Sequence, residues 1–356
     1  MAFIREITPE TLAEADGAKI AYIGKSGAGK TGSLASLVAA GYKLRILNTD
    51  KNTNILTSLL WDPRYPYRAY CESKGIDLST AVHTINIDIP MRLATVSRKV
   101  GQTTTTERLL APKNGNSWYE CIDALQDWHD GTKNQPDYFS FGHVESWDKD
   151  VVLVIDAFSK MAKMAYYNVQ SLNGRLGARD EGREYQRDIG GAQRMLERFL
   201  EWLASESIKC NVILISHVTW VDESRGFGQS PQQMEMKGEG SDPDGLPMAI
   251  GRALSPMIGS YFGDVFVARQ SGSGVSTSRE ISTVSTDGVL CKNSAFMNAK
   301  YSIRSGLAEI FAALRHQPEP LDLIAACGKP ARVQPIRPVK TNPSDDLSDL
   351  NARAKA

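Results

Sequence analysis

The stretch Gly24-Lys25-Ser26-Gly27-Ala28-Gly29-Lys30-Thr31 has the form G-x-x-x-x-G-K-T, the signature of a phosphate-binding loop. The aliphatic run before it, residues 19–23, predicts a buried strand, and a helix is expected over residues 31–40. In that setting the glycines let backbone N–H groups turn inward toward a β-phosphate. Lys30 is expected to reach the β- and γ-phosphates, and the Thr31 hydroxyl is expected to bind Mg²⁺. The whole octapeptide is therefore predicted to bind a nucleotide.

The composition favours a single large domain in a reducing compartment. Of the 356 residues, 42% are hydrophobic, which is enough for one sizeable core. The 41 basic and 41 acidic residues cancel, which argues against a uniformly basic coat for nucleic acid. The five cysteines are scattered without a C-x-x-C pair, as in reduced cytoplasmic proteins and unlike zinc sites. Since no apolar run is long enough to span a membrane, we expect a cytoplasmic protein without membrane partners.

Two further predicted strands lead into acidic residues. The run 43–48 precedes Asp50, and the β-branched run 151–155 ends in Asp156. Ligands of parallel α/β sheets bind at the carboxyl ends of the strands. Asp156 is therefore predicted to be the second protein ligand of Mg²⁺. Asp50 is predicted to orient or deprotonate the attacking water, the alternative being a cap for the helix that begins near Asn54.

A third strand, residues 211–215, ends in Ser216-His217. A polar side chain at this position faces the γ-phosphate, which makes His217 a candidate sensor of that group. The alternative is an ordinary hydrogen-bonded histidine of the core.

The domain organisation follows from these elements. Residues 1–17 are predicted to contain an N-terminal helix, 18–316 the P-loop domain, and 317–356 a flexible tail rich in prolines and small residues. Within the domain, residues 62–116 read as an insertion, in which the threonines of 103–106 suggest an exposed loop. A β-hairpin region is expected toward the C-terminal end of the domain.

The order of these parts resembles the RecA-like ATPases. The resemblance covers about residues 18–315, and it is closest to phage-encoded AAA-type nucleotide-binding proteins of the Sak single-strand annealing group. It implies an α/β fold, a RecA-like P-loop core with a mainly parallel central sheet flanked by helices. It further implies an ATPase that uses ATP and Mg²⁺, forms homo-oligomers, and lies in the host cell cytoplasm if phage-encoded.

The resemblance also implies roles for single residues. Asp50 matches the acid that activates water, usually Glu in the family, and His217 matches the sensing residue. Lys292, followed by Asn293, is similar to the signature by which one subunit reaches the nucleotide of the next. The loops after His217 and around 245–251 resemble DNA-contacting loops. The implied function is ATP hydrolysis coupled to single-stranded DNA in phage recombination, annealing or replication, with a single-strand-binding protein as a further partner.

Two other interpretations stay open. Lys25 occupies the place of the extra lysine of ParA/MinD-type partition ATPases, and residues 48–52 loosely echo the next motif of that group. The other interpretation is a scaffold protein that nucleotide binding switches without hydrolysis. Measuring the rate of ATP hydrolysis separates the scaffold from the two ATPase interpretations, because the scaffold would bind ATP without hydrolysing it.

Overall fold

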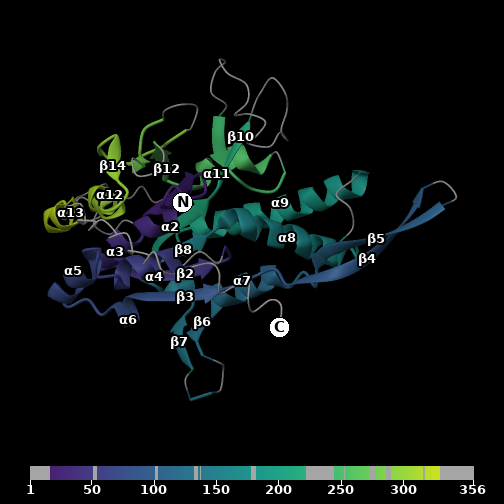
Figure 1. The fold of residues 1–356 in the computed structure, drawn as a ribbon, viewed down its shortest axis with the longest axis horizontal. Coiled ribbons are helices and arrows are strands. Elements are labelled where there is room, and N and C mark those ends of the chain that lie inside the picture. The colour runs from purple at the N-terminus through teal and green to yellow at the C-terminus, as the bar shows by residue number, and fades with distance from the viewer. Residues whose placement is uncertain are drawn as a thin grey trace, which may run out of the picture.

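A computed structural model of the chain describes residues 17–50, 54–100, 103–131, 135–136, 138–177, 182–221, 244–251, 253–272, 277–285, 290–315 and 317–328. Eight strands form its central sheet, in the spatial order β14 (Lys300–Ser302), β13 (Ser278–Ser282), β12 (Asp264–Ser271), β1 (Lys19–Gly24), β9 (Asn211–Ser216), β8 (Val151–Asp156), β2 (Lys43–Asn48) and β3 (Val82–Asn86). The six strands from β12 to β3 run parallel, whereas β13 pairs antiparallel with both β12 and β14. The predicted α/β class, with a mainly parallel central sheet flanked by helices and a C-terminal β-hairpin region, is confirmed (Figure 1).

The sequence explains why the middle of the sheet is parallel and covered on both faces. Every residue of β8 (VVLVID) and β9 (NVILIS) is buried. Continuous β-branched and aliphatic runs are typical of strands that pack helices on each side. The P-loop strand β1 lies between β9 and β12, so its carboxyl end opens at the centre of the sheet.

Two layers of helices cover the sheet (Figure 1). One layer contains α2 (Lys30–Ser33), α3 (Ala35–Ala39), α4 (Asn54–Trp61), α5 (Tyr67–Ser73), α12 (Gly306–Leu314) and α13 (Leu321–Gly328). The other contains α7 (Ser117–Gln126), α8 (Phe158–Leu172), α9 (Gly182–Ala204) and α11 (Leu254–Tyr261). Each layer has its own hydrophobic core, and the short α6 (Leu78–Ala81) leads into β3. The helix expected after the P-loop is divided into α2 and α3 at Leu34.

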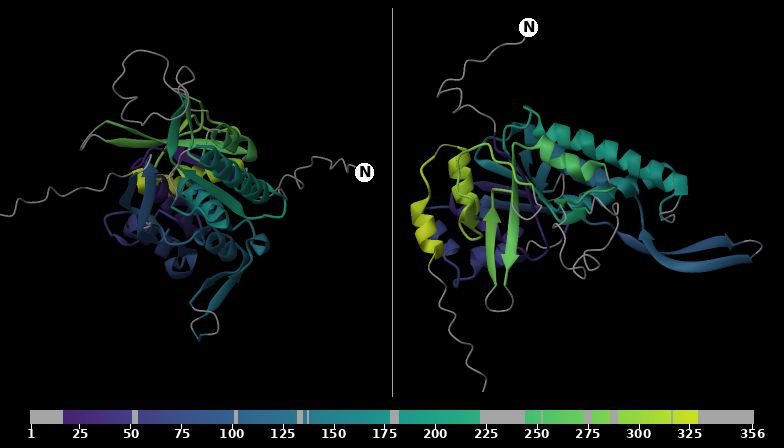
Figure 2. Two further views of the ribbon diagram at one scale, coloured as in Figure 1. Left: turned by 90° about the vertical axis from the view of Figure 1, so that its right-hand side faces the viewer. Right: turned by 90° about the horizontal axis from the view of Figure 1, so that it is seen from above.

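Among the described residues, three pairs of antiparallel strands lie outside the central sheet. They are β4 (Met91–Val100) with β5 (Thr103–Pro112), β6 (Trp128–Asp130) with β7 (Phe139–Gly142), and β10 (Val218–Val221) with β11 (Asp244–Pro247). A 3₁₀ helix, η1 (Val144–Ser146), precedes β8. We call the β4–β5 hairpin the arm, because it projects from the body of the molecule (Figures 1 and 2).

The arm corrects the expectation of a loop over residues 103–106. These four threonines belong to β5 and pair with residues 97–100 of β4. Threonine is β-branched and is enriched in strands. The region predicted as an insertion, 62–116, also contributes β3 to the central sheet, where Leu44 of β2 pairs with Val82.

The C-terminal region holds a second correction. Residues 321–328, expected in the flexible tail, form α13 and bury Leu323 and Cys327, one helical turn apart. Both side chains join the core under α5, and Lys74, the residue that follows α5, pairs with Asp322 at 3.1 Å. Residues 329–356 and the predicted N-terminal helix lie outside the described residues. Among the described residues no helix is long and apolar enough to cross a membrane.

Candidate nucleotide and metal site

The P-loop leaves β1 in a conformation that its glycines permit. Gly27 and Gly29 have φ values of 79° and 94°, in the left-handed region that side chains disfavour. A Cβ at Gly24 would lie 2.6 Å from the carbonyl oxygen of Ala268 in the neighbouring strand β12. The motif glycines are therefore needed for the turn itself and for close strand packing.

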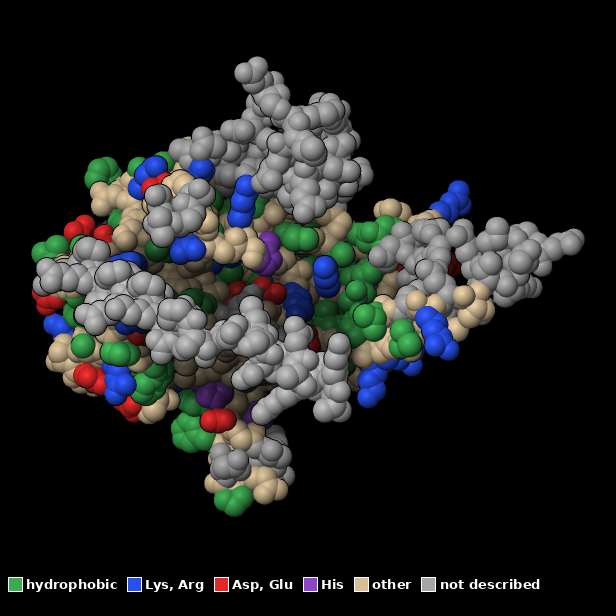
Figure 3. Space-filling model, in the orientation of Figure 1, with side chains coloured by type: hydrophobic (Ala, Val, Ile, Leu, Met, Phe, Trp, Pro, Cys, Tyr) green, Lys and Arg blue, Asp and Glu red, His purple; other side chains and the backbone are tan. Residues whose placement is uncertain are grey.

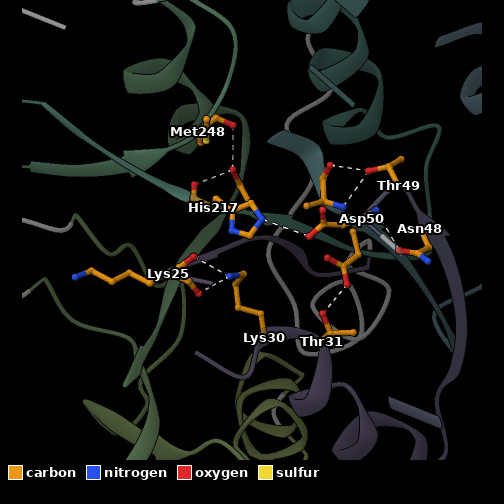
Figure 4. A network of polar contacts seen from close by, with 12 residues as sticks. Lys25, Lys30, Thr31, Asn48, Thr49, Asp50, His217 and Met248 are labelled. Carbon is orange, nitrogen blue, oxygen red and sulfur yellow. Dashed lines mark hydrogen bonds and ion pairs between the residues drawn. The ribbon is translucent and has the colours of Figure 1, made fainter. Parts of the chain in front are cut away.

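Lys30 lies inside the loop, with 7% of its surface exposed. Its ammonium donates hydrogen bonds to the carbonyl oxygens of Gly24 at 2.7 Å and Lys25 at 2.9 Å (Figure 4). Burial lowers the pKa of Lys30 to about 8, against the opposing effect of the nearby Asp156 and Asp50 carboxylates. The ammonium is thus held ready at the place where phosphate oxygens are expected.

The Thr31 hydroxyl donates a hydrogen bond of 2.6 Å to the Asp156 carboxylate. Asp156 is 3% exposed, and burial raises its pKa, although the Thr31 hydrogen bond and Lys30 act in the other direction. A hydroxyl and a carboxylate are hard oxygen ligands, and Mg²⁺ at phosphate sites uses one or two protein ligands, with phosphate oxygens and water completing its shell. The two side chains therefore fit the predicted Mg²⁺ site.

Backbone and side-chain hydrogen bonds fix the ends of β2 and β8 side by side. The Thr49 hydroxyl donates to the carbonyl of Ala157 at 2.9 Å and accepts from the Ala157 amide at 3.1 Å. The Thr49 amide also donates to the carbonyl of Asp156 at 2.6 Å. These hydrogen bonds hold the carboxyl ends of β2 and β8 together. Asp50 therefore lies at the same edge of the sheet as Asp156, and both residues line the same pocket.

His217 lies opposite Asp50, with its Nε2 atom 3.5 Å from an Asp50 carboxylate oxygen (Figure 4). The side chains are 30% and 28% exposed, so neither belongs to the core. The carbonyl of His217 accepts hydrogen bonds from the Met248 amide at 2.7 Å and the Ser216 hydroxyl at 3.0 Å, which fixes the strand end. The capping alternative for Asp50 involves residues 51–53, which lie outside the described residues.

These side chains line one pocket of about 590 Å³ at the carboxyl edge of the sheet. That volume is within the range of small-molecule and cofactor sites. The P-loop contributes Ser26, Gly27, Gly29, Lys30 and Thr31 to the lining. The ends of the strands contribute Asp50, Asp156 and His217. The pocket thus brings together most of the residues that the sequence predicted for nucleotide and metal binding.

Four predicted residues lie outside the lining of this pocket: Gly24, Lys25, Ala28 and Lys292. Ala28 is buried beneath the loop, and Lys25 is exposed, contributing its carbonyl to Lys30. Lys292 is outside the pocket lining: its ammonium donates to the carbonyl of Phe262 at 2.9 Å, and its backbone bridges to Val265. Its role toward a neighbouring subunit stays a prediction.

Sequence reasoning missed two arginines of the pocket. Arg279 comes from the antiparallel strand β13, and its Nε donates to the Gly27 carbonyl at 3.0 Å. Arg304 follows β14 and lines the same pocket, beside Tyr67, whose hydroxyl donates to the Arg304 carbonyl at 2.7 Å. Only the long-range pairing of β12, β13 and β14 brings these cations to the P-loop, so no local motif marks them.

Comparison with known proteins adds little to this picture. No protein-family model matches the chain, and no curated protein matches it. The solved structures that resemble it include the flagellar accessory protein FlaH from Methanocaldococcus jannaschii, with 11% identity, a TM-score of 0.32, and coverage of 80% of this chain and 84% of that one. A KaiC-like protein from Pyrococcus horikoshii OT3 has 12% identity, a TM-score of 0.31, and coverage of 81% and 85%. The function of this chain must therefore be inferred from the geometry of its own site.

Proposed function

We propose that this chain binds ATP together with Mg²⁺ and hydrolyses the terminal phosphate bond. The observation that carries the proposal is the convergence of the Lys30 ammonium, the Thr31–Asp156 pair and the Asp50–His217 pair on one pocket. Phosphoryl transfer depends almost entirely on positioning and on stabilising charge. A pocket with a cation, a metal site and a carboxylate in these places meets both needs.

Each side chain has a distinct task in this proposal. Lys30 exchanges its two carbonyl acceptors for phosphate oxygens when the nucleotide enters. Thr31 and Asp156 hold Mg²⁺, which neutralises charge on the β- and γ-phosphates. The Asp50 carboxylate orients the attacking water and accepts its proton.

Further groups stabilise the charge that develops during transfer. His217 lies against Asp50 and contacts the γ-phosphate side of the pocket. Arg279 and Arg304 supply positive charge from the same subunit. In a homo-oligomer Lys292 adds a cation to the nucleotide of the neighbouring subunit, which would make turnover depend on assembly.

The decisive test compares Lys30→Ala with the matched variant Lys209→Ala by steady-state phosphate release from ATP. Lys209 is exposed just before β9, at the opposite end of the strands from the pocket. Loss of the loop cation should lower turnover by at least about a hundredfold, as removal of a charge-stabilising donor typically does. Lys209→Ala should keep the parental rate. Turnover by Lys30→Ala at the parental rate would exclude this pocket as the site of hydrolysis.

We also infer that the ATPase acts on single-stranded DNA, in phage recombination, annealing or replication, with a single-strand-binding protein as a further partner. The inference is supported by the resemblance to the annealing ATPases and by the charge of the arm, which has four basic residues (Arg92, Arg98, Lys99, Arg108) and one acidic residue (Glu107) in its two strands. A local basic surface on a neutral chain is suited to phosphate contacts that release counterions.

The test is ATP hydrolysis with and without single-stranded DNA, at low and at moderate salt. Stimulation that fades as salt rises supports the inference, because contacts to phosphates weaken as counterions accumulate. Nucleotide-driven dimerisation that is indifferent to DNA would favour a partition-type ATPase. Binding of ATP without turnover would favour a nucleotide-switched scaffold.

A further inference from the structure

A second cleft, of about 500 Å³, adjoins the nucleotide pocket. Asp50 and His217 line both cavities and form the wall between them. The far side of the second cleft is the first two turns of α8, with Ser159, Lys160 and Lys163. A ligand in this cleft would therefore touch the same pair of side chains that faces the nucleotide.

Ser159 gives the first indication of what that ligand is. It is 7% exposed, and its hydroxyl oxygen is buried without a hydrogen-bond partner among the described residues. A buried hydroxyl left unpaired costs about 1–3 kcal/mol, so such groups are usually satisfied. The residue that precedes α8, Ala157, provides no side-chain cap for the helix. Ser159, with this unpaired hydroxyl, lines the cleft, and the first turn of α8 brings the positive end of a helix to the same place.

The charges of the cleft favour an anion. Lys160 pairs with Asp88 at 3.3 Å, and His217 pairs with Asp50 at 3.5 Å, so both carboxylates face a basic group. Lys163 is exposed and has no acidic partner within 4.0 Å in the described part of the chain. The unbalanced groups are therefore the Lys163 ammonium and the amino end of α8, and both attract negative charge.

The cleft also has apolar walls. Lys160, Lys163 and Tyr167 follow each other at helical spacing along one face of α8, which places an aromatic ring beside the cations. The apolar part of the lining also includes Ile89, Met91 and Met248. Cations beside an aromatic ring are the combination that binds a single strand, because the cations attract the backbone phosphates and the bases stack on the ring.

Met91 connects the cleft with the arm, since it is the first residue of β4. On the same face of the arm, Leu93 lies opposite Leu110 and Thr95 opposite Arg108. The two leucines are 65% and 69% exposed, and Met91 is 49% exposed. Figure 3 shows basic and hydrophobic side chains gathered over the surface between the body and the root of the arm. The apolar and basic character of the cleft thus continues outward along β4 and β5.

We propose that the cleft and this face of the arm form a track for single-stranded nucleic acid, a proposal that rests on the DNA-linked function inferred above. A backbone phosphate lies against Ser159, the amino end of α8 and Lys163. Adjacent bases contact Tyr167, Met91 and the leucines of the arm. The phosphate borders the Asp50–His217 wall, so strand binding on one side positions the side chains that act on the nucleotide on the other.

The test measures binding of a fluorescein-labelled oligothymidylate by anisotropy over a series of salt concentrations. Lys163→Ala should weaken binding and lower the slope of log K against log salt by about 1, the signature of one lost phosphate contact. Lys209→Ala should leave both the affinity and the slope unchanged. A second variant, Arg108→Glu, tests the arm and should weaken binding further, since it replaces attraction by repulsion.

Three other outcomes would contradict the proposed track. If DNA stimulates hydrolysis and Lys163→Ala and Arg108→Glu bind it like the parent, the strand lies elsewhere and the DNA-linked function stands. If the parent hydrolyses ATP but does not bind the oligonucleotide, both the track and the DNA-linked function fail. If calorimetry shows that thymidine monophosphate or inorganic phosphate binds in a Lys163-dependent manner while the oligonucleotide does not, the cleft is a site for a small phosphate compound.

Discussion

The nucleotide pocket and the arm are built in opposite ways. Side chains of the pocket stand at the ends of parallel strands, and those ends are joined to one another, as when Thr49 exchanges two hydrogen bonds with Ala157. The strands of the arm pair with each other, and leucines on one face lie open to water. An isolated two-stranded hairpin is marginally stable in water. We therefore expect the pocket to keep its shape without a ligand, whereas the arm would be stabilised by the strand that it is proposed to bind.

The largest effect expected from this difference concerns Asp50→Asn. The amide keeps the shape of the carboxylate but cannot accept a proton, so turnover should fall by about 10²–10⁴-fold while ATP still binds. Phosphate release and equilibrium binding of ATP measure the two quantities. The matched change in the arm, Leu93→Asn, should leave turnover without DNA close to the parental rate, because the side chain is remote from the pocket. Equal loss in both variants would show that the arm takes part in the chemistry.

A second prediction compares the stability of the two regions. Leu203 of α9 is fully buried, and Leu203→Ala should lower the free energy of unfolding by about 2–5 kcal/mol through lost burial and a cavity. Leu110→Ala in the arm should change it by no more than about 0.5 kcal/mol. Urea denaturation followed by circular dichroism measures both. A large loss for Leu110→Ala would mean that the arm packs against the body in the free protein.

The variant Arg279→Met tests whether the arginine from β13 contributes to the chemistry of the pocket. The substitution removes the hydrogen bond to the Gly27 carbonyl and one cation near the phosphates, so kcat/KM should fall about tenfold, as for loss of a single charged hydrogen bond. Arg198→Met, on the exposed side of α9, is the control and should behave like the parent. An unchanged kcat/KM for Arg279→Met would leave β13 with a structural role only.

The smallest effect is a pH dependence of nucleotide affinity. With a pKa of about 8, Lys30 is charged below pH 8 and loses its proton above it, and bound phosphates raise that pKa by favouring the charged form. The affinity for ADP without Mg²⁺ should therefore be level below pH 8 and fall above it, by at most about tenfold per pH unit. Calorimetry at pH 7, 8 and 9 measures this, with Lys30→Met as the control whose affinity should not follow the same curve. A flat profile for the parent would show that Lys30 stays charged in the free protein.

The sequence was sufficient to predict the site residues wherever a short local pattern determines their position. The P-loop glycines, the buried run before Asp156 and the strand before Asp50 each have a short signature, and the parallel order of strands brings them to one edge. What could not be predicted depends on contacts between distant segments. Arg279 reaches the loop through strand pairing.

The secondary-structure elements that the sequence did not predict also depend on contacts between distant segments. The four threonines of β5 look like a loop until the partner strand is known. The helix α13 forms because Leu323 and Cys327 find a core under α5, whereas the neighbouring prolines suggest a tail. In each case the segment itself carries too little hydrophobic pattern to indicate its partner.

The position of β1 has a consequence for synthesis of the chain. The strand that leads into the P-loop is made before both of its partners, because β1 pairs with β9, where Lys19 lies beside Val212, and with β12, where Ile20 lies beside Asp264. Contacts between residues so far apart form late, because the entropy of closing a long loop must be overcome first. A nascent chain therefore carries the complete phosphate-binding motif long before it has walls to hold a nucleotide, and capture of ATP would report that β9 and β12 have been made and have paired with β1.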